Sequence, residues 1–264
     1  MVDPSPMGAR LAEARDAGRK LLIPYLTAGF PDRDTTLPAL EALAEAGADA
    51  VELGIPFSDP LADGPVIAAA SQRAIAGGVT LEDALEICAA YAVNTRPPLV
   101  LFTYLNPLWA RGVDRAAAEC ADAGFAGVLI ADLPFDEGAE VSARFAARGL
   151  PLIRLAAPTT PTERLRVLAR LSEGFVYLIA RTGVTGEGAG ADERLAEQVE
   201  VLREETALPI VVGFGIGDAD SARRAALIGD GIVVGTAYVE RLDREGPEAA
   251  AEWIAELRDA LDRV

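Results

Sequence analysis

The chain has 264 residues, which fits one large domain such as a barrel of alternating strands and helices, normally about 250 residues long. Its net charge of −17 argues against nucleic acid or an anionic membrane as a partner, because both bind basic surfaces. Hydrophobic residues make up 51% and aromatic residues only 6%, so a core of Ala, Val, Leu and Ile is expected. Such a core suits parallel strands covered by helices.

Several residue types constrain the compartment and the chemistry. Apolar runs stay short of the ~18 residues of a membrane span, and residues 1–20 lack the apolar centre of a secretory signal. Cys88 and Cys120 lie in Ala-rich stretches without metal-like spacing, which predicts buried thiols in a reducing, cytoplasmic setting. Histidine is absent and Lys20 is the single lysine, so neither a metal site nor an imine-forming lysine is expected.

Taken in chain order, the sequence predicts a short helix and then alternating strands and helices. Strands are expected at 21–26, 50–53, 99–102, 127–130, 152–155, 175–179, 210–212 and 232–234. Helices are expected at 9–17, from a cap at Asp34 to 46, from Val66 onward, and at 81–92, 114–123, 137–148, 162–171, 192–206, 218–227 and 249–262.

A recurring unit indicates how these strands are arranged. In 46–53, 123–130 and 228–234 a helix is stopped by glycine and followed at once by a strand, which is typical of a parallel sheet. Eight strands joined by right-handed crossovers close most simply as an α/β barrel, here one domain over 1–264 with an extra N-terminal helix. A doubly wound open sheet is the alternative, disfavoured because no dinucleotide glycine fingerprint follows the first strand.

The stretch AVELGIPFSDPLADGP, residues 50–65, carries two acids at the carboxyl end of the second strand. Glu52 lies in the strand, and Asp63 lies on the loop that leaves it. A carboxyl partly desolvated at a strand end has a raised pKa, while one on a wet loop stays ionised, so the pair suits general acid–base chemistry. The structural alternative is that Glu52 pairs with an arginine and Asp63 caps the helix beginning at Pro65.

Glycines after the last three strands predict a phosphate end and a lid. Gly213, Gly215 and Gly217 follow strand seven and Gly235-Thr236 follows strand eight, where backbone amides and helix starts attract an anion. Segment 181–190 is glycine-rich, as in a lid that closes over substrate. The alternatives are that the glycines only ease tight turns and that 181–190 is a disordered surface loop.

ELGIPFSDPLADGP resembles the signature of the tryptophan synthase alpha subunit, and the resemblance extends over about 21–239. It implies a TIM barrel and a lyase of tryptophan biosynthesis that cleaves indole-3-glycerol phosphate to indole and glyceraldehyde 3-phosphate. Glu52 matches the acid–base glutamate and Asp63 the aspartate that contacts indole. The matching phosphate contacts are Gly186, Gly215, Gly235 and Thr236.

The resemblance also implies a pocket and a partner. The indole pocket would comprise Tyr25, Ile67, Phe102, Leu129, Tyr177, Thr185 and Phe214, although most such residues are ordinarily core. Pro56, Asp59 and Asn106 match the face toward a beta subunit in an alpha2-beta2 heterotetramer. Pyridoxal phosphate would belong to that subunit alone, with no cofactor in this chain. Tyr25, Phe102, Gly217 and Thr236 stand where many members have Phe, Leu, Ser and Ser.

Three other functions remain open. A stand-alone indole-3-glycerol phosphate lyase would use the same acids without a beta partner. A barrel that binds phosphorylated metabolites without converting them is a second possibility, which intact Glu52 and Asp63 oppose. A Schiff-base aldolase is disfavoured because Lys20 is its only candidate lysine.

Overall fold

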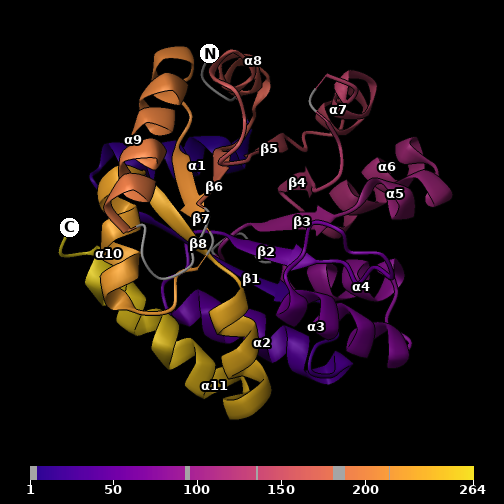
Figure 1. Ribbon diagram of the computed structural model, residues 1–264. Coiled ribbons are helices and arrows are strands. Elements are labelled where there is room, and N and C mark those ends of the chain that lie inside the picture. Colours follow the sequence, from indigo (N-terminus) through magenta and orange to yellow (C-terminus); the bar gives the residue numbers. More distant parts are fainter. Residues whose placement is uncertain (1–4, 93–95, 135, 181–187, 214) are drawn as a thin grey trace.

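The strands form a closed parallel barrel in this computed structural model, which describes residues 5–92, 96–134, 136–180, 188–213 and 215–264 (Figure 1). Each strand pairs with the next, and β8 closes the barrel on β1. This confirms the predicted barrel and excludes the open sheet. The strands are β1 Leu21–Thr27, β2 Val51–Gly54, β3 Leu99–Thr103, β4 Gly127–Ile130, β5 Leu152–Ala156, β6 Val176–Ile179, β7 Ile210–Gly213 and β8 Gly231–Val234.

Helices cover the outside of the barrel, and their bounds are close to those predicted, with four differences. They are α1 Pro6–Asp16, α2 Arg33–Glu45, α3 Pro65–Ala76, α4 Leu81–Tyr91, α5 Leu105–Arg111, α6 Val113–Ala123, α7 Ala139–Ala146, α8 Thr162–Leu171, α9 Gly188–Glu205, α10 Ala219–Ile228 and α11 Thr236–Leu261. The short helix α5 was not predicted. The cap of α2 is Asp32 rather than Asp34, because the Asp32 carboxylate accepts the Thr35 amide at 2.9 Å.

The other two differences concern α9 and α11. Helix α9 begins at Gly188, so the end of the predicted loop 181–190 is helical. Helix α11 begins directly after β8, well before residue 249, and a non-helical Gly246 with φ of 82° divides it. The last helix therefore starts at the rim of the barrel, where its first turn can contribute to a site.

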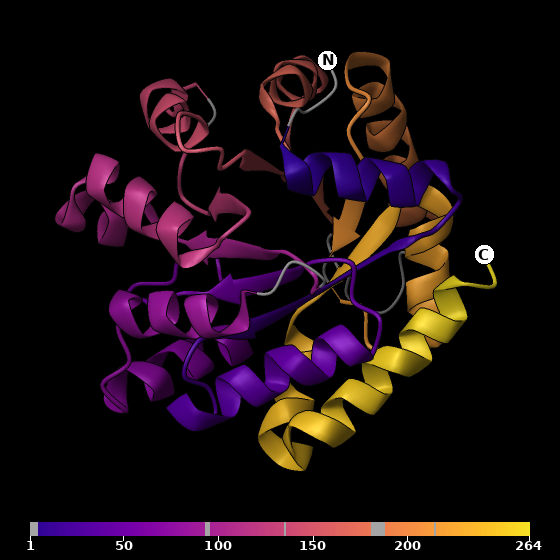
Figure 2. The ribbon, with the colours of Figure 1, turned by 180° about the vertical axis from the view of Figure 1, so that it is seen from behind.

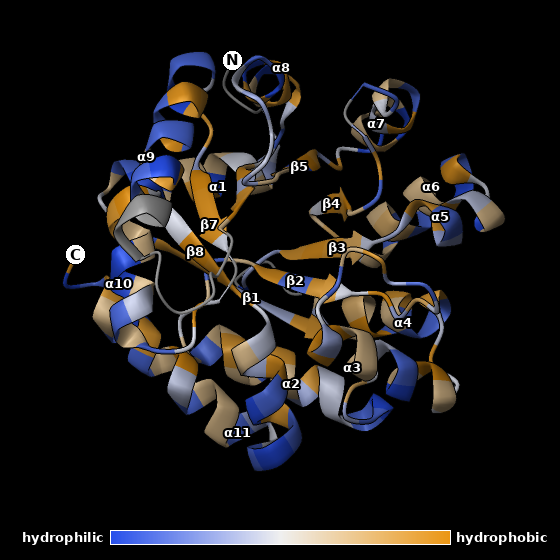
Figure 3. Cartoon of the chain, viewed as in Figure 1, coloured by the Kyte–Doolittle hydropathy of each residue, from blue (hydrophilic) through white to orange (hydrophobic). Residues whose placement is uncertain are grey.

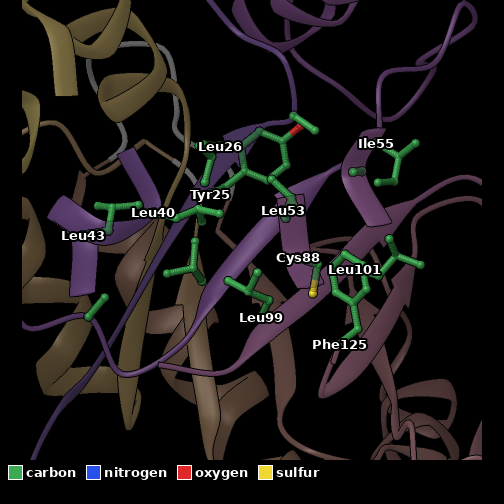
Figure 4. Packing of buried hydrophobic residues seen from close by; sticks show 14 of the residues in the cluster. Tyr25, Leu26, Leu40, Leu43, Leu53, Ile55, Cys88, Leu99, Leu101 and Phe125 are labelled. Atoms are coloured by element: carbon green, nitrogen blue, oxygen red, sulfur yellow. The ribbon is translucent and has the colours of Figure 1, made fainter. Parts of the chain in front are cut away.

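Two apolar layers hold the barrel together. Inside it, side chains of alternate strand positions pack in one cluster, including Leu21, Ile23, Val100, Ile153 and Val233. Outside it, the orange faces of strands and helices meet in Figure 3. Leu26, Leu40, Leu53 and Leu101 belong to this outer cluster, part of which is shown in Figure 4. Both clusters consist mainly of aliphatic residues, as the composition predicted.

The two cysteines belong to the outer layer. Cys88 and Cys120 are free and buried, as predicted. No helix of the described residues is long and apolar enough to cross a membrane.

Acids at the amino-terminal end of the barrel tie neighbouring strands together. Asp49, just before β2, accepts the Leu22 amide of β1 at 2.8 Å. Glu173, before β6, accepts the Leu152 amide of β5 at 2.7 Å, and Asp230, before β8, accepts the Ile210 amide of β7 at 2.9 Å. Each acid satisfies an amide at the start of the preceding strand, where the ladder has no partner for it. These acids therefore stabilise the fold and lie away from the carboxyl-end rim.

Helix α1 closes the same end of the barrel. Viewed from behind in Figure 2, this indigo helix lies across the barrel. Its Met7 and Leu11 are buried in the interior cluster with Leu21 and Ile153. The predicted extra helix is thus a plug opposite the rim where the strands end.

We expect Leu11→Ala to lower the free energy of unfolding by about 2–4 kcal/mol, because it removes a fully buried side chain and leaves a cavity under the barrel. Urea unfolding measures the change. The control is Leu227→Ala on α10, where the side chain is 70% exposed and a change within about 0.5 kcal/mol is expected. Equal effects of the two substitutions would show that α1 is not packed on the barrel.

Candidate active site

A cavity of about 280 Å³ opens at the carboxyl ends of the strands, opposite α1. Glu52 of β2 and Asp63 of the β2–α3 loop both line it. Gly215, after β7, and Thr236, at the start of α11, line it as well. The structure therefore brings the two predicted acids and the predicted phosphate loops to one space, in the position where barrel enzymes hold their substrates.

Glu52 is a buried carboxyl without a compensating charge. Its side chain is 1% exposed, Oε1 has no hydrogen-bond partner, and no ion pair involves it among the described residues. Burial raises the pKa of Glu52 to about 8, so the carboxyl is mainly protonated at neutral pH. Among the described residues, which include the neighbouring strands β1 and β3, no arginine pairs with Glu52, so the alternative of a structural ion pair finds no support there. A protonated carboxyl therefore lines the cavity.

Asp63 is half-buried, which differs from the wet loop position predicted for it. Burial raises the pKa of Asp63 to about 6, while a hydrogen bond from the Tyr104 hydroxyl acts in the opposite direction. Asp63 is thus mainly ionised at neutral pH, and the two acids differ in acidity as predicted. Helix α3 is capped by Gly64 without a side-chain bond, so Asp63 does not cap that helix.

Tyr104, at the end of β3, holds the loop that carries Asp63. Its hydroxyl accepts the Ala62 amide at 3.0 Å and donates to Asp63. Phe57 from the β2–α3 loop stacks on the Tyr104 ring, with ring centroids 5.0 Å apart. Tyr104 was not among the predicted site residues, so its contact with Asp63 is new from the structure.

Removing the Tyr104 hydroxyl is expected to impair Asp63 specifically. In Tyr104→Phe the Asp63 pKa should rise above about 6, so kcat/KM should fall several-fold near pH 6.5 and recover toward pH 8. Steady-state cleavage assays across this range measure the effect. The control is Tyr91→Phe, because the buried Tyr91 hydroxyl has no hydrogen-bond partner. A loss in Tyr104→Phe that is the same at every pH would contradict the role.

Aromatic rings form one wall of the cavity. Tyr25 and Phe102 meet edge to face with centroids 5.2 Å apart, and Tyr177 and Ile67 line the same space. Gly54 and Gly213 make room for two of these rings, because a Cβ at Gly54 would overlap the Tyr25 ring and one at Gly213 the Tyr177 ring. Gly213, predicted as part of an anion loop, therefore serves the aromatic wall.

Another part of the cavity wall is built from backbone and the start of α11. Gly215 has φ of 77°, a conformation that favours glycine, and both it and Gly217 are exposed to the cavity. Gly235 caps α11 without a side-chain bond, which leaves the first amides of that helix open to an anion. Helix α10 differs, because Asp218 accepts the Ser221 amide at 2.7 Å and so caps its own helix.

Some predicted residues lie elsewhere. Thr185, Gly186 and Phe214 fall outside the described residues. Leu129 is fully buried in the interior cluster and is not among the residues that line the cavity. The cavity is also lined by residues that were not predicted, namely Ala62, Gly64, Leu155, Ile179, Ile216, Val233, Ala237 and the exposed Glu240. Alternate side chains of a barrel strand point inward, and this alternation along β5 and β8 could have identified Leu155 and Val233 as candidate lining residues.

Metal and imine chemistry find no support in the part of the chain that the structure describes. No cluster of acidic or cysteine side chains there fits a metal ion. Lys20 donates from Nζ to the Gly229 carbonyl at 3.1 Å and is not among the residues lining the cavity. Lys20 lies just before β1, at the barrel end opposite the site, which argues against a Schiff-base aldolase.

The predicted partner face adjoins the site on the β2–α3 loop and α5. Asp59 and Asn106 are exposed and Pro56 is half-buried. Two large apolar side chains are exposed on the same elements, Leu61 at 94% and Trp109 at 66%. Exposed Trp and Leu beside a functional loop are typical of a protein-binding surface.

The fold and the rim cavity define an enzyme of the (β/α)8-barrel class. The sequence profile of one family, described as tryptophan synthase alpha chain, matches residues 11–262. A tryptophan synthase alpha chain of Synechococcus elongatus is 46% identical over 253 residues, covering 96% of this chain and 95% of its own. That of Dechloromonas aromatica is 45% identical over 252 residues, covering 94% of each.

Solved structures agree with the sequence comparisons. Tryptophan synthase subunit alpha of Legionella pneumophila superposes with a TM-score of 0.90 at 31% identity, covering 98% of this chain and 99% of the other. A chain from Mycobacterium tuberculosis tryptophan synthase superposes with a TM-score of 0.89 at 35% identity, covering 97% of this chain and 98% of the other.

The chain therefore belongs to the tryptophan synthase alpha chain family, as the resemblance indicated. It is a lyase of tryptophan biosynthesis that cleaves indole-3-glycerol phosphate. The alpha reaction needs no cofactor, since pyridoxal phosphate is held by the beta chain.

Proposed function

We propose that Glu52 and Asp63 carry out the retro-aldol cleavage together, Glu52 as the acid–base group and Asp63 as the electrostatic partner of the indole ring. The observation that carries this proposal is that a buried, unpaired carboxyl and an ionised one face the same cavity. Their unequal pKa values assign the roles, because one holds a proton near neutral pH and the other a negative charge.

The proton movements balance with Glu52 alone. Protonated Glu52 gives its proton to indole C3, forming an indolenine whose ring nitrogen carries the positive charge. The Asp63 carboxylate accepts a hydrogen bond from that N–H and stabilises the charge as it grows. The bond between C3 and the glycerol carbon then breaks with its electrons moving to the ring, and the Glu52 carboxylate takes the proton of the glycerol hydroxyl as the aldehyde forms. Glu52 ends protonated, ready for another turnover.

The phosphate is proposed to bind at Gly215, Gly235 and Thr236, with Gly186 from the segment outside the described residues. The open amides at the start of α11 and the left-handed Gly215 support this end of the cavity as the anion site. Tyr25, Ile67, Phe102 and Tyr177, which line the same cavity, would then enclose the indole ring. Binding at the distant phosphate holds the scissile bond near Glu52.

A beta subunit is proposed as the partner, in an alpha2-beta2 heterotetramer. The surface formed by Pro56, Asp59, Asn106, Leu61 and Trp109 supports this assignment, because it is exposed, partly apolar and adjacent to the Asp63 loop. We further propose that 1–264 acts as one domain in the cytoplasm, in keeping with the continuous barrel and the buried free thiols.

The test is release of indole from indole-3-glycerol phosphate by the purified chain, alone and with a tryptophan synthase beta chain. Indole and glyceraldehyde 3-phosphate are expected in equal amounts, with a marked acceleration when the beta chain is added. Activity that does not respond to any beta chain would favour the stand-alone lyase. Binding of the substrate without cleavage in either condition would favour the non-catalytic barrel.

A further inference from the structure

A second cavity, of about 310 Å³, lies outside the barrel between β4 and β5 and the helices that follow them. The residues that line it come from the end of β4 and the loop after it, from β5 and the loop after it, and from α8, and these elements can be followed in Figure 1. Its apolar lining includes Ile130, Leu133 and Leu168, and Arg154 lines it from β5. The proposed catalytic acids do not line this space.

Arg154 is a buried cation, and two of its three guanidinium nitrogens lack hydrogen-bond partners. Its side chain points outward from β5 and is 5% exposed, and its Nε and Nη1 have no hydrogen-bond partner. The nearby Glu173 carboxylate favours the charge, but no ion pair joins the two among the described residues, and Glu173 already accepts the Leu152 amide at 2.7 Å. An uncompensated buried guanidinium is destabilising, so a partner that fills the cavity would stabilise the protein.

The surroundings of the guanidinium leave room for it. A Cβ on Gly138 would lie 2.8 Å from Arg154 Nη1 and 3.1 Å from the Leu133 side chain. Gly138 has φ of −86°, a value open to any residue, so glycine is required here for the space it leaves and not for its backbone conformation. The β4–α7 loop therefore passes over the guanidinium because residue 138 is glycine.

The other polar groups of the cavity fit an anion rather than a cation. The Thr160 Oγ1 accepts the Ala157 amide at 3.0 Å, which leaves its hydroxyl proton to donate. Asp132 also lines the cavity, but its carboxylate accepts the Leu105 amide at 2.7 Å. Arg164 adds a second positive charge at the opening, where it also pairs with Asp136 at 3.4 Å.

We propose that this cavity is a binding site for a small organic oxyanion, a carboxylate or phosphate monoester carried on an apolar group, with Arg154 as its charged contact. The two terminal guanidinium nitrogens suit the paired oxygens of such a group, and the aliphatic lining suits the apolar part. Leu155 lines both this cavity and the active-site cavity, so a ligand bound here would contact a residue that also forms the wall of the active site. This proposal stands independently of the roles assigned to Glu52 and Asp63.

Titration calorimetry with benzoate and with phenyl phosphate tests the site, with benzyl alcohol as the neutral probe. At least one anion is expected to bind the full chain with Kd below about 10 mM, and Arg154→Met should weaken that binding at least about tenfold, while benzyl alcohol should bind no differently to the two. The anion whose binding weakens in Arg154→Met shows whether the site takes a carboxylate or a phosphate monoester. Gly138→Ala, which crowds the guanidinium and keeps its charge, should also weaken binding.

The control is Arg223→Met on α10, where the arginine is paired with Asp220 at 2.7 Å and lies outside both cavities. Anion binding should be unchanged in this variant. Arg154→Met should unfold at a temperature no lower than the parent, since it removes an unpaired buried charge. The proposal is overturned if neither anion binds, or if both bind equally well to the parent and to Arg154→Met.

Discussion

Replacing Glu52 by Gln is expected to lower the turnover of indole-3-glycerol phosphate by about 10²–10⁴-fold, the usual contribution of a positioned acid–base group. The amide keeps the size of the side chain but has no proton to transfer to indole C3. Glu52 is buried, its Oε1 has no hydrogen-bond partner, and no hydrogen bond among the described residues joins another acid to it. Initial rates of indole release under saturating substrate measure the effect.

Two further variants make this result specific. Asp63→Asn should lower turnover separately, because the neutral amide does not balance the charge on the indolenine. Glu252→Gln, an exposed position on the outer side of α11, should leave turnover unchanged. Turnover of Glu52→Gln within about tenfold of the parent would place less than about 1.4 kcal/mol of the barrier at this residue and refute its role.

The same Glu52→Gln change is expected to stabilise the protein at alkaline pH. The Glu52 pKa is about 8 in the folded chain against 4.5 for an ordinary glutamate of the unfolded chain, so between these pH values the folded state holds a proton that the unfolded state has lost. The free energy of unfolding of the parent therefore falls as pH rises through this window, and the whole loss is reached above pH 8. The difference of about 3.5 between the two pKa values corresponds to at most about 5 kcal/mol.

Urea unfolding of the parent and of Glu52→Gln at pH 5 and pH 9 measures this effect. The variant should gain stability over the parent by several kcal/mol between the two pH values, because glutamine does not titrate. Glu252→Gln is again the control, and its difference from the parent should stay constant. If the difference in free energy of unfolding between Glu52→Gln and the parent were the same at pH 5 and pH 9, the pKa of Glu52 would not be raised in the folded protein.

Together these two results would show that Glu52 raises the turnover of the enzyme and lowers its stability at alkaline pH. A carboxyl held without partners destabilises the fold when it ionises, yet the same isolation keeps it protonated near neutral pH. A glutamine at this position would make a more stable and nearly inactive protein.

Much of the fold follows from local sequence signals. A glycine between a helix and a short β-branched run marked three of the strand starts, and the barrel strands were located within a residue or two. Helix caps were less predictable, because Asp32 and Asp34 are both suitable residues and only the backbone conformation selects Asp32. Helix α5 was missed because seven residues containing Pro107 do not display a helical period.

The site was predictable where a residue conflicted with its surroundings. Glu52 could be singled out because it is an acid within an apolar strand, and in the structure its Oε1 has no hydrogen-bond partner. The Tyr104–Asp63 contact was not predictable, since it joins two loops whose separation depends on the closed barrel. The inward alternation likewise did not distinguish Leu129, deep in the interior, from Leu155, which reaches the cavity.

Carbon-13 NMR titration of the glutamate carboxyl groups would show whether Glu52 holds a proton at neutral pH, with the Glu52 signal assigned by its absence in Glu52→Gln. Our account predicts that Glu52 titrates near pH 8, well above the other glutamates. A Glu52 carboxyl that titrated below pH 5 would be ionised throughout the neutral range, and it would then have no proton to deliver to the indole ring.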